Sequence, residues 1–65
     1  MAFSNNIKEL RKLKGLTQEE MASKLEIAQA TYCQYETGAK SPNVYIAQEI
    51  ANIFGVTLDS LMKGA

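Results

Sequence analysis

The stretch Leu16–Gly38, "LTQEEMASKLEIAQATYCQYETG", carries the strongest local structural signals in the chain. Thr17 and Glu20 have the T-x-x-E spacing of a capping box, in which each side chain binds a backbone N–H left free at a helix start. We therefore predict that a helix begins at Thr17. Its inner face is formed by three apolar residues, Met21, Ala22 and Leu25.

A second helix follows after a joint of about three residues. The apolar phase breaks at Glu26–Ile27, and the next helix is predicted over Gln29–Thr37, where Gly38 ends it. Tyr32 and Tyr35 fall three apart and are predicted to face inward. A joint this short is typical of a helix-turn-helix, whose second helix projects far enough to enter the major groove of DNA.

A further helix is predicted before this pair. Ile7, Leu10 and Leu13 fall three apart, which places them along one helical face. Ser4–Asn6 supplies N-cap residues for this helix, and Gly15 suits the left-handed position after its end.

Two more helices are predicted after the pair. The loop "AKSPN" ends at Asn43, a good cap for a helix over Val44–Phe54, and Thr57 caps a last short helix. No segment has the pattern of a strand. We predict one domain over residues 1–65, an all-α compact bundle of five short helices.

Composition narrows the classes of function. The 65 residues include seven basic and seven acidic side chains, one Cys and no His, so neither a disulfide framework nor a zinc site is expected. The start lacks a signal peptide's pattern, and no apolar run is long enough for a membrane span. We expect a cytoplasmic protein without metal or cofactor. We expect no enzyme, because the chain has no clustered carboxylate pair, phosphate-binding Gly loop or activated nucleophile.

The second helix of the pair presents a polar outer face. On the predicted register four side chains point outward, namely those of Gln29, Ala30, Cys33 and Gln34. A glutamine amide offers a donor and an acceptor together, which suits adenine in the major groove, and an alanine methyl can pack on a thymine methyl. These groups would suit base reading, but composition alone favours an ordinary solvent-exposed polar helix face.

The segments "IKELRKLKGLTQEEMASKLEIAQATYCQYETGAKSPN" and "IAQEIANIFGVTLDSLM" together resemble the Cro/C1-type helix-turn-helix family of phage repressors and small bacterial regulators. The resemblance covers residues 7–62. It implies a five-helix fold of the phage-repressor type with a helix-turn-helix at about residues 17–37. It also implies double-stranded operator DNA as the ligand and a homodimer on a near-palindromic site.

The same resemblance implies roles for individual residues. Base contacts are expected from Gln29, Ala30 and Gln34. Contacts to the DNA backbone are expected from Gln18, Thr31, Cys33, Lys40, Ser41 and Asn43. In relatives, the residues that match Arg11 and Glu36 form an ion pair, so a structural ion pair is expected here as well.

The end of the chain is more apolar than a small monomer needs. A dimer interface is therefore expected to include some of four residues, Phe54, Val56, Leu58 and Met62. Local core packing is the alternative for these side chains.

The turn departs from the family pattern at two positions. Glu26 stands where Gly is usual, and a left-handed backbone there costs a non-Gly residue roughly 1–2 kcal/mol. Ala28 stands where a Ser or Thr cap is common, and losing such a cap costs about 1 kcal/mol.

These patterns predict a sequence-specific DNA-binding transcriptional regulator, in particular a repressor acting as a homodimer. Two alternatives stay open. The first is an antitoxin-like or protein-docking helix-turn-helix module, which is compatible with the net charge of zero. The second is the N-terminal DNA-binding domain of a longer repressor.

Overall fold

The computed structural model describes residues 2–62, which form five α-helices and no strand within that range. The helices are α1 (Ala2–Leu13), α2 (Gln18–Leu25), α3 (Gln29–Thr37), α4 (Val44–Phe54) and α5 (Leu58–Met62). The predicted all-α class and the bounds of the third and fourth helices are confirmed.

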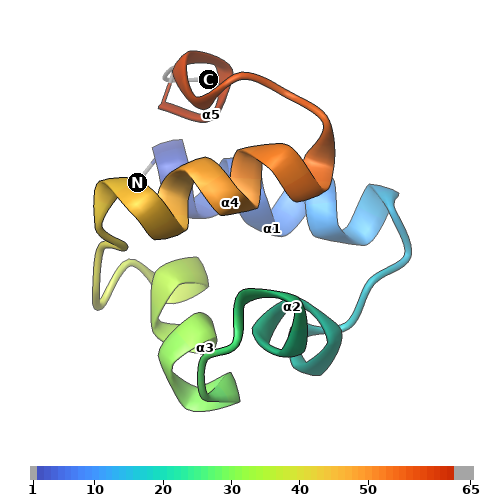
Figure 1. Ribbon diagram of the computed structural model, residues 1–65, viewed down its shortest axis with the longest axis vertical. Coiled ribbons are helices and arrows are strands. Elements are labelled where there is room, and N and C mark those ends of the chain that lie inside the picture. Colours follow the sequence, from blue (N-terminus) through green and yellow to red (C-terminus); the bar gives the residue numbers. More distant parts are fainter. Residues whose placement is uncertain (1, 63–65) are drawn as a thin grey trace.

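The helix-turn-helix pair occupies one end of the molecule. Figure 1 shows α2 and α3 together at the end opposite α5, with α1 and α4 lying between them. α2 packs against α3, and α1 packs against both α3 and α5. α4 contacts α1, α2 and α5 and so covers the centre.

One hydrophobic core joins all five helices. The buried members of the cluster are Ile7, Met21, Ala22, Leu25, Tyr32, Tyr35, Ile50, Ala51, Phe54 and Leu61. The predicted inner face of α2 is confirmed, because its three apolar residues belong to this cluster. A chain of 65 residues buries little surface, so α2 and α3 depend on this shared core for their fixed positions.

The first helix begins earlier than predicted. α1 starts at Ala2, so Ser4 and Asn6 lie within the helix and do not cap its start. Ser4 is buried, and Asn6 Nδ2 donates a 2.7 Å hydrogen bond to the carbonyl oxygen of Leu61 in α5.

The predicted inner face of α1 is wrong at its last member. Ile7 is fully buried and Leu10 packs partly against the core, but Leu13 is 80% exposed. A spacing of three falls short of the 3.6-residue turn, so Leu13 lies about 120° around the helix from Ile7. The side chain has therefore turned into solvent.

The predicted caps of the last two helices are present. Asn43 Oδ1 accepts a 2.9 Å hydrogen bond from the backbone N–H of Ile46 at the start of α4. Thr57 Oγ1 accepts a 3.0 Å bond from the backbone N–H of Ser60 at the start of α5. Each cap satisfies a donor that a helix start leaves without a partner.

Candidate nucleic-acid interface

The start of α2 is fixed by a reciprocal cap. Thr17 Oγ1 accepts a 3.0 Å hydrogen bond from the backbone N–H of Glu20, and Glu20 Oε1 accepts a 2.8 Å bond from that of Thr17. The predicted capping box is therefore confirmed. It places Gln18 as the first residue of α2, where its side chain can reach across to α3.

The turn between α2 and α3 has a left-handed backbone at Glu26, with φ 58° and ψ 42°. The backbone N–H of Ile27 donates a 3.0 Å hydrogen bond to the carbonyl of Ala22, which closes the end of α2. Glu26 thus adopts the left-handed conformation that usually favours Gly. Accepting it costs roughly 1–2 kcal/mol.

The start of α3 has no side-chain cap. Ala28 occupies the N-cap position with extended backbone and makes no side-chain hydrogen bond there, as its methyl side chain requires. The first backbone donors of α3 are left to solvent or to a ligand.

The two faces of α3 differ in the way that the helical phase predicts. Tyr32 is fully buried, Tyr35 and Glu36 are also buried, and the tyrosine rings meet edge to face with centroids 6.3 Å apart. On the other side three side chains are exposed, those of Gln29, Ala30 and Gln34, which we call the recognition face. Cys33 lies one helical turn after Gln29 and Ala30, and both it and Thr31 are half-buried.

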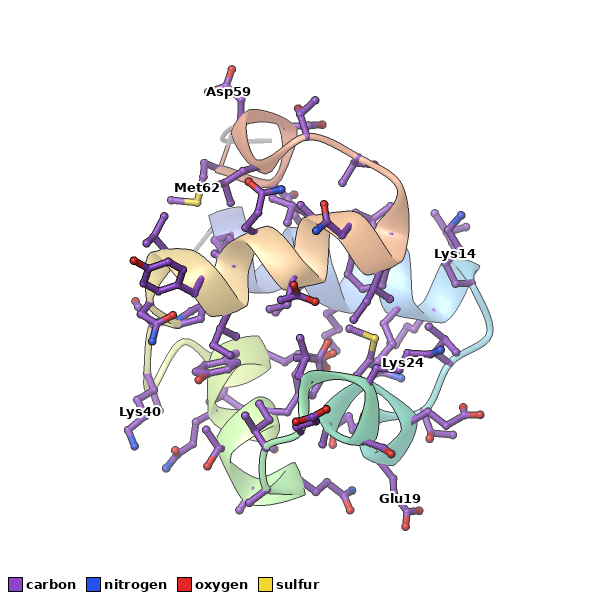
Figure 2. The ribbon with its side chains drawn as sticks, viewed as in Figure 1. Lys14, Glu19, Lys24, Lys40, Asp59 and Met62 are labelled. Atoms are coloured by element: carbon purple, nitrogen blue, oxygen red, sulfur yellow. The ribbon has the colours of Figure 1, made fainter. Side chains whose placement is uncertain are left out.

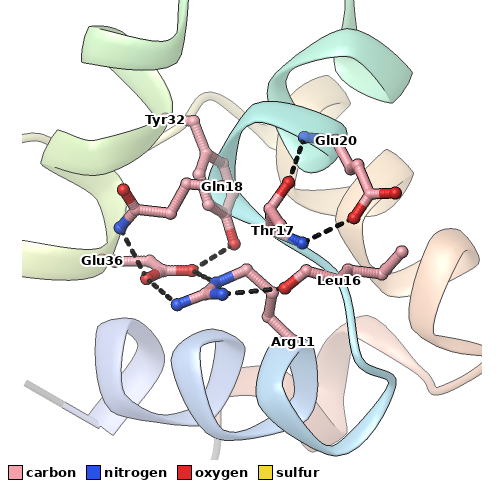
Figure 3. A network of polar contacts seen from close by, with 7 residues as sticks. All are labelled: Arg11, Leu16, Thr17, Gln18, Glu20, Tyr32 and Glu36. Carbon is pink, nitrogen blue, oxygen red and sulfur yellow. Dashed lines mark hydrogen bonds and ion pairs between the residues drawn. The ribbon is translucent and has the colours of Figure 1, made fainter.

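The carboxylate of Glu36 joins three helices. Arg11 of α1 donates from Nε to Oε2 at 2.7 Å and from Nη2 to Oε1 at 3.2 Å, so the structure contains an ion pair at the expected residues. Gln18 of α2 donates from Nε2 to Oε1 at 3.1 Å, and Tyr32 donates its hydroxyl to Oε2 at 2.6 Å. Figure 3 shows these three side chains converging on the carboxylate.

Arg11 also holds the segment before α2. Its Nη1 donates a 2.8 Å hydrogen bond to the carbonyl oxygen of Leu16, next to the capping box (Figure 3). The guanidinium is thereby satisfied by both the loop and α3, and its side chain is only 13% exposed. This geometry fixes α3 relative to α1 and to the start of α2.

The surroundings of Glu36 act on its pKa in two directions. Burial raises the pKa, because the charged carboxylate loses water. The hydrogen bonds from Arg11, Tyr32 and Gln18 lower it, and together they prevail, so the pKa lies below the ordinary 4.5. The bond to Glu36 raises the pKa of Arg11, and burial with the same carboxylate raises that of Tyr32.

Sequence reasoning missed the role of the Tyr32 hydroxyl. Tyr32 was predicted only to face inward, and its hydroxyl is in addition bound to Glu36. The i, i+4 spacing of Tyr32 and Glu36 on a buried face is the signal that could have identified this pair. The Gln18 bond to the same carboxylate spans 18 positions, and no local spacing indicates it.

The loop after α3 presents polar groups beside that helix. Lys40 and Ser41 are exposed, and Figure 2 shows Lys40 pointing into solvent beside α3. The backbone N–H of Lys40 donates a 3.2 Å hydrogen bond to the carbonyl of Gln34, which ties the loop to α3. Asn43 is exposed at the start of α4, with its side chain engaged in the cap.

The four residues expected at a dimer interface divide into three groups. Phe54 is 2% exposed and belongs to the core of its own chain, so it has no surface to offer a partner and is corrected to a core residue. Val56 and Leu58 are half-buried and pack against the core. Met62 is the last residue of α5 and is 59% exposed (Figure 2).

An apolar groove lies beside Met62. It has a volume of about 290 Å³ and is lined by Phe3, Ser41, Pro42, Val44, Ala47, Leu58 and Met62. Val44 and Tyr45, at the start of α4, are also largely exposed. The groove therefore continues as an apolar surface at this end of α4.

Within residues 2–62, no group of three or more His, Cys, Asp or Glu side chains has an arrangement that would hold a metal ion. Within the same range, none of the helices has the length and apolar character needed to cross a membrane.

Comparison with known proteins relates this geometry to characterised folds. Residues 7–61 match a family model described as Helix-turn-helix. The chain is 47% identical over 62 residues to the uncharacterized HTH-type transcriptional regulator YqaE of Bacillus subtilis, covering 95% of this chain and 53% of that protein. It is 35% identical over 61 residues to the cryptic phage CTXphi transcriptional repressor RstR of Vibrio cholerae, covering 94% and 55%.

Among solved structures, the chain resembles SinR, described as the master regulator for biofilm formation and solved in complex with DNA. The TM-score is 0.85 at 22% identity, and the match covers 94% of this chain and 98% of that one. This likeness confirms the fold. The chain spans about half the length of the two curated relatives above.

Proposed function

The chain belongs to the Cro/C1-type helix-turn-helix family, and from this membership we propose that it is a sequence-specific DNA-binding transcriptional regulator that reads its operator with α3. One observation carries the proposal. The exposed side of α3 presents two amides and a methyl group, while the opposite side of the same helix is locked to α1 and α2 through Glu36. A groove-reading helix needs both features.

The recognition face supplies groups that match base edges. Gln29 and Gln34 each offer a donor and an acceptor, a pair of groups that fits N7 and N6 of adenine. Ala30 lies between them in sequence and presents a methyl group suited to contact with thymine. All three side chains are exposed.

The surrounding residues are assigned to the DNA backbone. Lys40 provides a positive charge beside α3. Short polar groups close to the recognition face come from Ser41, Thr31 and Cys33. Gln18 uses one amide N–H on Glu36 and keeps the second for a phosphate. Asn43 caps α4, whose N-terminal end favours a negative charge nearby.

The net charge of zero agrees with this division of labour. Neutral donors and a few cations position the protein on phosphates, and the amides discriminate between bases. Because few cations take part, affinity should fall with salt less steeply than for a strongly basic protein, with a slope of about −0.9 per neutralised phosphate.

The test is selection of binding sites from random DNA duplexes, followed by affinity measurements on the selected site at several salt concentrations. The expected result is one enriched, near-palindromic site whose affinity falls linearly on a log–log plot against salt. No enriched site together with a flat salt response would contradict the proposal. That outcome would favour an antitoxin-like or protein-docking module instead.

We propose repression as the mode of regulation. The support is the description of the Vibrio cholerae relative as a transcriptional repressor. The proposal concerns the DNA-binding step, which these residues would carry either alone or as part of a longer repressor. A protein with this role works in the cytoplasm. A reporter gene whose promoter overlaps the selected site should be silenced by the chain, and increased expression would contradict repression.

We also propose that the chain binds its operator as a homodimer. The support is the apolar surface formed by Met62, the half-buried Val56 and Leu58, and the neighbouring groove. A two-fold axis would place two copies of α3 one turn of DNA apart, about 34 Å, which fits a near-palindromic site.

Sedimentation equilibrium with and without the selected duplex tests this dimer. Met62→Lys should weaken association, because it places a charge on the apolar surface. Leu13→Lys is the matched control, since Leu13 is also an exposed apolar residue but lies at the end of α1. A parent chain that stays monomeric at high concentration and on DNA would contradict the dimer.

A further inference from the structure

Tyr32 is the largest fully buried side chain of α3, and its hydroxyl hydrogen is donated to Glu36 Oε2 at 2.6 Å. We propose that this hydroxyl is a positioning group for DNA reading, which sets the rotation of α3 about its axis and thereby the aim of the recognition face. The inference rests on the proposed function for its consequence on DNA, whereas the positioning itself can be measured without DNA.

The acceptor of this hydrogen bond is held from outside α3. Glu36 Oε2 also accepts from Arg11 of α1, and Oε1 accepts from Gln18 of α2 and again from Arg11. The carboxylate is therefore a fixed point defined by two other helices (Figure 3). A group that binds it is positioned relative to those helices.

α3 is attached to this carboxylate from two successive helical turns. Glu36 and Tyr32 are four residues apart, which separates their Cα atoms by about 6 Å along the axis. A single attachment at Glu36 would allow α3 to rock about that side chain. The second attachment, through the Tyr32 ring, removes this freedom because rotation would carry the hydroxyl away from the carboxylate.

The start of α3 has no other polar side chain to hold it. Ala28 provides no side-chain cap, and the turn before it includes the left-handed Glu26. Within α3, the only side chain before Glu36 that makes a hydrogen bond is that of Tyr32. It is thus the polar anchor nearest to Gln29 and Ala30 in the sequence.

The hydroxyl also disfavours alternative rotations. A phenol inside the core that loses its only acceptor is left without a hydrogen bond, which is costly in the interior of a protein. The Tyr32 ring in addition packs edge to face on Tyr35, with an interplanar angle of 81°. Both contacts select one orientation of the helix.

The test compares Tyr32→Phe with Tyr35→Phe. The first variant keeps the ring and removes the bond to Glu36. The second is the matched control, because Tyr35 is a buried tyrosine of the same helix whose hydroxyl makes no hydrogen bond in the described chain. For each protein, affinity is measured for the selected site and for a site altered at the base pairs assigned to Gln29 and Gln34, well below the melting temperature.

Tyr32→Phe is expected to reduce the ratio of affinity for the selected site to affinity for the altered site about ten-fold. This is the size expected from loss of one hydrogen bond to a charged group. Affinity for the altered site should stay near the parent value. Tyr35→Phe should keep the parent ratio. A hydroxyl that only stabilised the fold would lower the melting temperature of Tyr32→Phe without changing this ratio. An unchanged ratio would overturn the proposed effect on DNA reading.

Amide hydrogen exchange separates this inference from the proposed function. The backbone amides of Tyr32 and Cys33, the first in α3 with helical acceptors, should exchange faster in Tyr32→Phe than in Tyr35→Phe, because the start of α3 has lost its anchor. If the parent selects no DNA site, the proposed function fails while faster exchange still supports positioning. Equal exchange in the two variants would overturn the positioning role itself.

Discussion

The guanidinium of Arg11 and the carboxylate of Glu36 meet side by side in two hydrogen bonds, across 25 positions of sequence. Their side chains are 13% and 2% exposed, so the pair lies largely out of solvent. Removal of one partner leaves the other charge buried without compensation, which is far more damaging than loss of a surface ion pair. The pair is therefore expected to govern stability rather than DNA contact.

Arg11→Met should lower the free energy of unfolding by about 3–5 kcal/mol, because Glu36 loses two of its four donors. Urea unfolding measures this change. Lys12→Met is the control, since Lys12 is adjacent but exposed, and its effect should stay within about 0.5 kcal/mol. If Arg11→Met unfolded like the parent but lost DNA binding, Arg11 would be a DNA contact instead.

Acid should destabilise the fold partly through Glu36. Its pKa in the folded chain lies below the ordinary 4.5, so its contribution is complete above pH 4.5 and is lost as pH falls from there through the folded value. The slope from this one group reaches at most about 1.4 kcal/mol per pH unit. Urea unfolding should be measured between about pH 2 and about pH 7. The free energy of unfolding should fall less steeply with acid in Glu36→Gln than in the parent.

Glu19→Gln is the control for this pH dependence. Glu19 is exposed in the first turn of α2, so its replacement should leave the parent's acid slope in place. Equal slopes in the parent and in Glu36→Gln would show that the Glu36 carboxylate is not the group that titrates.

Glu26→Gly should stabilise the fold. The residue has φ 58°, where a Cβ atom is strained, and relief of this strain should exceed the extra flexibility that Gly gives the unfolded chain. The expected net gain is about 0.5–1 kcal/mol, measured by thermal unfolding. Glu19→Gly is the opposite control, because Gly in regular helix should destabilise by about 1 kcal/mol. A loss of stability in both variants would argue against strain at Glu26.

Gln29→Ala and Lys40→Ala should change DNA binding in different ways. Loss of a base-reading amide should relax preference at one position of each half-site, at about 1–3 kcal/mol of discrimination. Loss of Lys40 should weaken all sequences alike and reduce the salt slope by about one. Parallel binding assays on single-base variants of the selected site measure both effects.

Gln48→Ala provides the matched control for these binding assays. Gln48 is an exposed glutamine of α4, so its loss should alter neither the base preference nor the salt slope. If Gln29→Ala and Gln48→Ala gave the same preference at every position, Gln29 would not be a base contact.

Local signals predicted most of the fold. The Thr17–Glu20 pair and the cap at Asn43 act within four residues, so their hydrogen bonds could be inferred from spacing alone. The turn departs from the family pattern at Glu26, yet its backbone is left-handed without a Gly. Local rules failed at two positions of α1. Ser4 was predicted as a cap but is a buried residue within the helix, and Leu13 was predicted on the inner face but is exposed.

The exposed face of α3 could be predicted from the sequence, whereas most of the hydrogen bonds around Glu36 could not. Helical phase placed Tyr32 and Tyr35 inside and Gln29 outside, as the structure has them. The donors that meet Glu36 come from three helices, and the Gln18 contact depends on how α2 crosses α3. Such crossings depend on packing of the whole core, which no local pattern encodes.

The bond between Asn6 and the carbonyl of Leu61 has a consequence for the order of assembly. It joins positions 55 apart, and α5, with only five residues, is too short to persist without a surface to pack on. Leu61 leaves the ribosome long after Asn6. The Asn6 side chain therefore lacks this hydrogen-bond acceptor until nearly all of the described chain has been made. We expect the domain to complete its folding as a unit once Leu61 has left the ribosome, and not helix by helix before that point.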